Sequence, residues 1–125
     1  MLEEQLTGEI INAFYTVYNK LGYGFLEKVY EKALLIELNN RNFVCDAQNQ
    51  IEVFYEGQIV GLYYADIVVN NLVILEIKAA ETICEEHEIK LINYLKATKM
   101  ELGLLLNFGK KPQIKRKIYT NDFKP

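Results

Sequence analysis

The chain has 125 residues, half of them hydrophobic and a quarter charged, with a formal net charge of −3 at pH 7. This composition is typical of one globular domain with a core, so we treat residues 1–125 as a single domain. The charge gives no overall attraction to nucleic acid, and no apolar run approaches the roughly 20 residues of a membrane span. The acidic start does not resemble a secretion signal, so we expect a cytoplasmic protein with Cys45 and Cys84 reduced.

The hydrophobic pattern predicts two helices, three strands, a third helix and two further strands. In chain order these are Leu2–Lys20, Phe25–Asn40, Gln50–Tyr55, Ile59–Val69, Leu72–Ala79, Glu85–Lys99, Glu101–Asn107 and Gln113–Tyr119. Short turns join the first three strands, which should be antiparallel, whereas the third helix is a crossover that makes the following apolar strand parallel to an earlier one. The expected fold class is α/β, with a mixed sheet of about five strands flanked by helices.

The strands on either side of Asn70-Asn71 hold charged residues in otherwise apolar segments. Side chains alternate between the faces of a strand, so a two-residue turn would put Asp66 and Glu76 on opposite faces. A three-residue connection from Asn70 to Leu72, with one residue in the left-handed conformation, would instead pair the two acids. Asparagine tolerates that conformation. We therefore predict a hairpin of odd length that brings the two carboxylates together.

Paired carboxylates repel each other unless a positive charge lies between them. Lys78, on the same strand face as Glu76, offers one charge, and Mg²⁺ or Mn²⁺ offers more. A cation held by Asp66 and Glu76 would bind a phosphate oxygen and lower the pKa of a bound water, while the lysine orients that water or stabilises charge. The alternative is a structural ion pair, but three charges on inner strands are costly, so we favour phosphodiester hydrolysis.

Two of the predicted helices hold further candidate residues. Glu27 falls at helical spacing from apolar residues of the second helix, which places it in the apolar arc and Glu31 in the polar arc. A first-turn glutamate is also favoured by the helix dipole alone, which is the structural alternative. On the third helix, Lys90 and Tyr94 lie one turn apart and form a polar edge beside the sheet, whereas the lone His87 is expected to be solvated.

The segment 110–117 holds five basic residues and no acid, namely Lys110, Lys111, Lys115, Arg116 and Lys117. A local basic patch can bind phosphates even on an acidic protein. With Lys96, these residues would contact a nucleic-acid backbone, which conveys no sequence information. The alternative is a solvated, charged edge strand.

Four blocks, in order along nearly the whole chain, resemble a known family. Gly24–Tyr30 resembles the signature GxxExxY, and Asp66 followed by Glu76-Ile77-Lys78 resembles the D…ExK core of the PD-(D/E)xK nuclease superfamily. Asn93–Thr98 and Gly103–Gly109 resemble the NYLKAT and GLLxNFG blocks of the small GxxExxY proteins. Each block alone is a weak signal, but the four together are specific.

The resemblance implies a restriction-endonuclease-like fold and a nuclease that cleaves DNA with Mg²⁺ or Mn²⁺ as cofactor. It implies that Asp66, Glu76 and the carbonyl oxygen of Ile77 bind the metal, and that Lys78 is the catalytic lysine. Glu27 would correspond to the helical glutamate that assists the metal site in the RecB-like and Cas4-like branches.

Those branches also have a Q-x-x-x-Y motif on the crossover helix. Here the spacing is kept by Lys90 and Tyr94, which together with Tyr30 are the accessory residues expected at the site. A lysine at this position could contact a phosphate, or pair with a site carboxylate and displace the metal. Two hypotheses follow: a DNA nuclease, acting alone or as a homodimer, and a non-catalytic nucleic-acid-binding module on the same fold. A phosphatase is less favoured because the chain has no Gly-rich phosphate loop.

Overall fold

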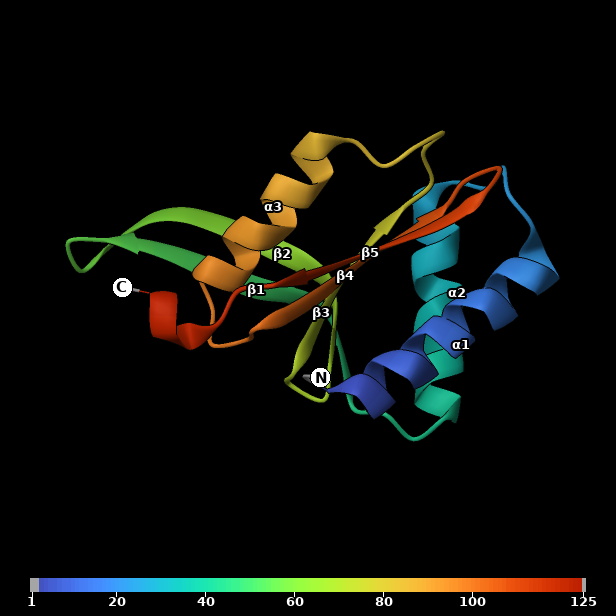
Figure 1. Cartoon of the computed structure of the whole chain (residues 1–125), viewed down its shortest axis with the longest axis horizontal. Helices are drawn as coiled ribbons and strands as arrows, with labels where there is room; N and C mark the ends of the chain where they lie inside the picture. The colour runs from blue at the N-terminus through green and yellow to red at the C-terminus, as the bar shows by residue number, and fades with distance from the viewer. Residues whose placement is uncertain (1–2, 125) are drawn as a thin grey trace.

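The computed structural model describes residues 3–124 and shows one β-sheet with helices on both faces (Figure 1). Its elements are α1 (Glu4–Leu21), α2 (Glu27–Asn40), β1 (Cys45–Tyr55), β2 (Gln58–Val69), β3 (Val73–Lys78), α3 (Glu85–Lys96), β4 (Leu102–Phe108), β5 (Pro112–Ile118) and a short 3₁₀ turn, η1 (Asn121–Phe123). The helix start expected at Leu2 lies outside the described residues. No helix among the residues described is long and apolar enough to cross a membrane.

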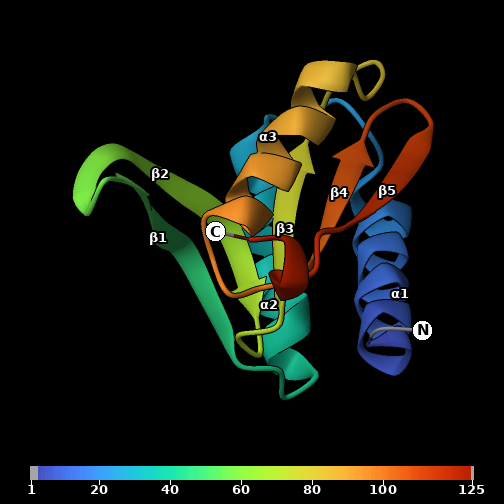
Figure 2. The same ribbon diagram turned by 60° about the vertical axis from the view of Figure 1, so that its left-hand side comes forward.

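The five strands lie in the sheet in chain order, from β1 to β5. β3 and β4 are parallel because α3 connects them, and all other neighbouring strands are antiparallel. Figure 2 shows α3 in front of the sheet, with α1 and α2 behind it and the β1–β2 hairpin extending away from the body. The predicted α/β class, with a mixed five-stranded sheet, is confirmed.

Most element boundaries lie within two residues of those expected, and two differ by more. β1 begins at Cys45 rather than Gln50 because its pairing with the long β2 starts at the Cys45–Val69 pair. The third helix ends at Lys96 rather than Lys99, and the hydroxyl of Thr98 donates a hydrogen bond back to the carbonyl of Tyr94. Good helix formers continue the pattern in the sequence, but the chain must turn here to enter β4.

The core consists of two apolar clusters, one on each face of the sheet. The cluster under α1 and α2 includes Phe14, Tyr30 and Phe108, and the cluster under α3 includes Leu91 and Leu105. β4 is buried over its full length because helices cover both of its faces. A Cβ at Gly103 would lie 2.6 Å from Leu91, so glycine is what allows α3 to approach β4 this closely.

Tyr30 fixes the connection between α1 and α2. Its hydroxyl donates to the carbonyl of Gly22 at 2.6 Å and accepts from the amide of Phe25 at 3.2 Å. Its ring stacks on Phe108, with the ring centroids 4.4 Å apart. Gly22 ends α1 at φ 68°, in the left-handed region that glycine populates readily. Tyr30 therefore lies in the core, where it positions α2.

Candidate active site

The connection between β2 and β3 has an odd number of residues, as predicted. Val69 pairs with Val73, and the amide of Leu72 donates to the carbonyl of Val69 at 2.9 Å. Both Asn70 (φ 53°) and Asn71 (φ 55°) are left-handed, whereas one such residue was expected. The pairing continues to Ile67 and Leu75. Asp66 and Glu76 therefore lie opposite each other, one position beyond this pair.

Asp66 and Glu76 are held together by reciprocal hydrogen bonds. The amide of Asp66 donates to Oε2 of Glu76 at 2.8 Å, and the amide of Ile77 donates to Oδ2 of Asp66 at 2.7 Å. At the end of the strand ladder, each carboxylate thus accepts a hydrogen bond from a backbone amide of the neighbouring strand, as a backbone carbonyl does within the ladder. The two side chains lie side by side, and one oxygen of each stays outside these backbone hydrogen bonds.

Gln48 marks an irregularity in the sheet beside this pair. Its neighbours on β1 pair with the neighbours of Asp66 on β2, but Gln48 and Asp66 are not themselves a ladder pair. Gln48 has φ 53°, which is strained for a residue other than glycine or asparagine. Its side-chain amide donates to Oε1 of Glu31 at 3.0 Å. Backbone strain of this kind clusters at functional sites.

The helical glutamate that is buried beside the site is Glu31, and the arcs assigned to Glu27 and Glu31 are wrong. Glu31 is 8% exposed, whereas Glu27 is exposed. Glu27 is the first residue of α2 and follows the exposed Leu26, so no neighbouring element covers it. Glu31 stands three and seven residues before the buried Leu34 and Leu38. That spacing was visible in the sequence and could have identified it.

Burial raises the pKa of the Asp66 carboxyl to about 6. The hydrogen bond from Ile77 lowers this pKa, but the negative charges of Glu31 and Glu27 raise it again. The charges of two α2 carboxylates therefore act on Asp66. Glu27 takes part through its charge although its side chain is exposed.

Burial also raises the pKa of the Glu76 carboxyl, to about 7, and repulsion by Asp66 adds to the effect. The hydrogen bond from the amide of Asp66 and the charges of Lys90 and Lys78 lower it. Glu76 is only 2% exposed. Near neutral pH the pair therefore resists carrying two negative charges, which is the electrostatic environment that a cation would relieve.

Lys90 provides a positive charge on the α3 side of Glu76. Its Nζ lies 3.7 Å from Oε1 of Glu76 and 5.5 Å from the centre of the Tyr94 ring. Of the two arrangements that the sequence left open for this lysine, the structure shows the pairing with a site carboxylate. Lys78 lies half-buried at the end of β3 and has a weaker effect on Glu76.

Asn107 fixes the segment that follows Lys78. It is fully buried, and its side chain accepts from the amide of Ala80 and donates to the carbonyl of Ala80 and to Oε1 of Gln113. The asparagine in the GLLLNFG block therefore positions the end of β3. His87, expected to be solvated, is partly buried and accepts a hydrogen bond from the amide of Cys84 at the start of α3.

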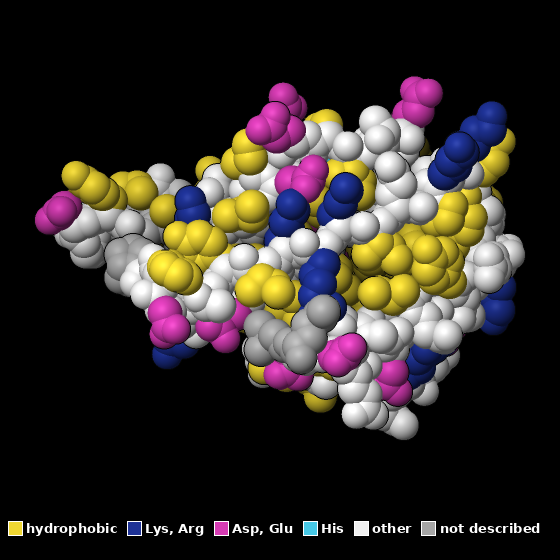
Figure 3. All heavy atoms as spheres, viewed as in Figure 1, with side chains coloured by type: hydrophobic (Ala, Val, Ile, Leu, Met, Phe, Trp, Pro, Cys, Tyr) yellow, Lys and Arg dark blue, Asp and Glu magenta, His cyan; other side chains and the backbone are white. Residues whose placement is uncertain are grey.

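The basic residues expected to contact nucleic acid do not form one patch. Lys117 pairs with Glu88 of α3, whereas Arg116 donates to the hydroxyl of Thr7 on the opposite face. Lys115 lies on the same face of β5 as Lys117 and also acts on Glu88, whereas Lys110 and Lys111 are exposed in the β4–β5 turn and Lys96 lies over the ring of Tyr119. On the side of the molecule seen in Figure 3, Lys and Arg side chains are spread between hydrophobic areas.

The donor set at Asp66 and Glu76 fits a small divalent cation. Carboxylate and carbonyl oxygens are hard donors of the kind that Mg²⁺ and Mn²⁺ prefer. The two raised pKa values show that the site favours added positive charge. Within residues 3–124, no three Asp, Glu, His or Cys side chains converge closely enough to enclose a metal by themselves. A bound cation would thus need backbone or solvent oxygens besides the two carboxylates.

Comparison with known families identifies the chain. The family model described as "PD-(D/E)XK nuclease superfamily" matches residues 4–117. The chain belongs to the PD-(D/E)XK nuclease superfamily. The expected superfamily is thereby confirmed, and proteins of this superfamily are generally nucleases that act on nucleic acid, typically with Mg²⁺ or Mn²⁺.

A solved structure supports the fold of this superfamily member. The crystal structure of SSO0001 superposes with a TM-score of 0.57 at 18% sequence identity, over 74% of this chain and 50% of that one. The chain thus spans about half the length of that protein, and the likeness concerns the fold alone. The restriction-endonuclease-like fold is confirmed. A search of curated proteins finds no match.

Proposed function

We propose that this chain is a metal-dependent nuclease that hydrolyses phosphodiester bonds in DNA. The observation that supports the proposal best is the reciprocal hydrogen bonding of Asp66 and Glu76, which holds two buried carboxylates side by side at the end of a strand ladder. A stabilising role explains this arrangement poorly, because burial disfavours the charged form of both groups. Membership in the nuclease superfamily supports phosphodiester hydrolysis as the reaction of these two carboxylates.

In this proposal Asp66, Glu76 and the carbonyl of Ile77 hold Mg²⁺ or Mn²⁺. When bound, the cation neutralises the phosphate and favours deprotonation of the attacking water. Lys78 orients that water and stabilises the charge that develops on the phosphate. A bond forms between the water oxygen and phosphorus while one ester P–O bond breaks, and the leaving oxygen takes up a proton.

Glu31 and Gln48 join the site as positioning residues in this proposal. Gln48 holds one oxygen of Glu31, and Lys28 holds the other at 3.0 Å. Glu31 in turn interacts with the Asp66 carboxylate. Glu31 therefore takes the position that the resemblance to the RecB-like and Cas4-like branches assigned to Glu27, one helical turn further along α2. We also propose that the chain belongs to the GxxExxY family within this superfamily.

The test is a cleavage assay on linear, single-stranded and branched DNA with Mg²⁺, Mn²⁺ or EDTA. We expect metal-dependent cutting by the wild type that is lost in Glu76→Gln and in Lys78→Met. Glu81→Gln is the matched control, since this exposed glutamate lies three residues after Lys78 and takes no part in the site. Retained cutting by Glu76→Gln would exclude the assigned site. Tight, salt-dependent DNA binding without cutting would favour the non-catalytic module instead.

Lys90→Gln tests the role of the lysine that pairs with Glu76. If the ammonium competes with the metal for Oε1 of Glu76, this variant should need less Mg²⁺ for half-maximal cutting at pH 8. A higher Mg²⁺ requirement would instead assign Lys90 to phosphate binding. The titration therefore separates the two arrangements that the sequence left open for this residue.

A further inference from the structure

Of the large hydrophobic side chains that are exposed within residues 3–124, seven lie close together in the β1–β2 hairpin. We call residues 51–64 the arm. Its large side chains that are 48–69% exposed are Phe54, Tyr55, Ile59, Val60, Leu62, Tyr63 and Tyr64. Figures 1 and 2 show this hairpin extending beyond the region of the sheet that the helices cover. Within residues 3–124 these side chains stay about half exposed or more, although burial of each would be favourable.

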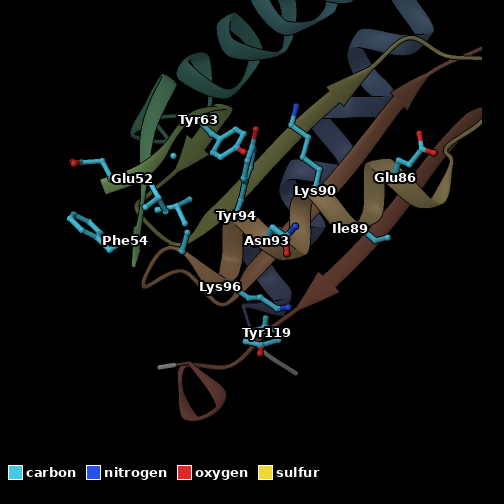
Figure 4. Close-up of a pocket in the computed structure, with 14 residues that line it drawn as sticks. Glu52, Phe54, Tyr63, Glu86, Ile89, Lys90, Asn93, Tyr94, Lys96 and Tyr119 are labelled. Atoms are coloured by element: carbon cyan, nitrogen blue, oxygen red, sulfur yellow. The ribbon is translucent and has the colours of Figure 1, made fainter. Parts of the chain in front are cut away.

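A groove runs between the arm and α3. It has a volume of about 820 Å³ and is lined on one side by arm residues such as Phe54 and Val60, and on the other by α3 residues such as Ile89. Figure 4 shows Tyr63 and Tyr94 close together in the groove, with ring centroids 5.7 Å apart. The arm and the groove are adjacent, so one partner can cover both.

The charges of the arm do not suit nucleic acid. Residues 42–77 include no lysine or arginine, and the arm itself has two acids, Glu52 and Glu56. Phosphates would be repelled by this surface. The other wall of the groove, on α3, has Lys90 and Lys96 but also Glu86, and Lys90 already pairs with Glu76. Lys96 is therefore the residue of this wall that can attract an acidic residue of an apolar segment such as the arm.

The two edges of the sheet also differ. β5 begins with Pro112 and has three basic residues, devices that keep other strands from pairing with an edge. β1 is 11 residues long and has no proline, lysine or arginine. β1 does have the left-handed Gln48 and a register shift between Val53 and Phe54, which discourage strand addition, so we expect a partner on the faces of the arm rather than along this edge.

The exposed area matches that of a stable dimer. Counted over both faces of the hairpin, seven large side chains, each roughly half to two-thirds exposed and each offering about 200 Å² in full, give roughly 800 Å² per copy. A standard stable interface buries about 800 Å² per partner, and an arm that lies in a groove between two elements can bury both of its faces. We propose that this chain forms a homodimer in which the arm of each copy lies in the groove between the arm and α3 of the other.

A two-fold axis satisfies both surfaces at once, because each copy offers one arm and one groove. The acidic tip at Glu56 then approaches Lys96 of the second copy. The inference is independent of the nuclease proposal, since it uses neither the carboxylate pair nor a metal.

The test measures association by sedimentation equilibrium in EDTA, so nuclease activity plays no part. We expect a species of twice the chain mass of 14.5 kDa at micromolar concentrations. Val60→Asp should weaken association at least 100-fold, because it buries an unpaired charge in the interface. The matched control is Ile36→Asp on α2, a β-branched residue of similar exposure (62% against 65%) that lies outside the arm and should not change association. Circular dichroism and thermal unfolding establish that both variants fold.

A second variant keeps the proposal testable if Val60→Asp fails to fold. Glu56→Lys changes an exposed turn residue and should weaken association about tenfold, and Lys96→Glu in the same chain should restore it. A wild type that stays monomeric at 200 µM would overturn the proposal, as would equal association of the wild type and the arm variants. A monomer whose tyrosine fluorescence is quenched by a single-stranded oligonucleotide would overturn it as well, and would assign the groove to nucleic acid.

Discussion

Replacing Glu76 by glutamine should stabilise the protein at alkaline pH and have little effect in acid. Its pKa is raised from an ordinary value of 4.5 to about 7, a difference of about 2.5 pH units. Each unit corresponds to about 1.4 kcal/mol, so ionising Glu76 in place costs about 3.5 kcal/mol relative to the unfolded chain. The pKa of Glu76 is higher in the folded state than in the unfolded chain. The stability that the protonated carboxyl contributes is therefore fully present below about pH 4.5 and is lost as the pH rises through about 7.

The assay is urea unfolding of the wild type and of Glu76→Gln in EDTA at pH 5 and pH 8. The variant keeps an oxygen that can accept from the amide of Asp66, so the hydrogen bond survives. We expect the difference in unfolding free energy between the two proteins to widen in favour of the variant by roughly 2–3 kcal/mol between these pH values. Glu88→Gln is the control, because Lys117 lowers the pKa of Glu88 from 4.5 and this carboxyl is therefore largely ionised at both pH values. Its difference from the wild type should stay nearly constant, and an equal difference at both pH values for Glu76→Gln would refute the reasoning.

Three further predictions follow from the same contacts. Mg²⁺ or Mn²⁺ at about 100 times its dissociation constant should stabilise the wild type by about 2.7 kcal/mol at pH 8, seen as a rise in melting temperature that is absent in Asp66→Asn. Glu31→Gln should lower the pKa of Asp66 from about 6, because it removes a nearby negative charge; carbon NMR of the Asp66 carboxyl measures the shift, and an unchanged value would contradict the electrostatic role of Glu31. Asn107→Ala should destabilise the fold by about 2–4 kcal/mol in urea unfolding, since it leaves the partly buried backbone of Ala80 without its partners, and a loss below about 1 kcal/mol would argue against this role.

The fold could be predicted well because its signals are local. The long apolar run of β4 and the helix before it fixed the parallel pair in the middle of the sheet. Asn70-Asn71 pointed to a hairpin of odd length, and the observed pairing of Val69 with Val73 agrees. The extent of β1 was underestimated, because its first residues are polar and form a strand only through pairing with β2.

The candidate site could be predicted in part. The carboxylates of Asp66 and Glu76 meet as expected, because strand alternation and turn length together determine their register. Glu27 and Glu31 were assigned to the wrong arcs, because periodicity shows which residues share a direction but not which turn of the helix is covered. Gln48 could not be found at all, since its contact with Glu31 joins residues that are 17 positions apart.

The sequence by itself determined the order of helices and strands, the hairpin that joins β2 to β3, and the residue types that suit a metal-dependent site. These depend on periodicity and turn chemistry, which act over a few neighbouring residues. Only the tertiary structure decided which glutamate of α2 reaches Asp66, that Lys90 pairs with Glu76, and that the arm stays uncovered. Each of these depends on how separate elements pack, because burial and charge at one residue are set by side chains far away in the chain.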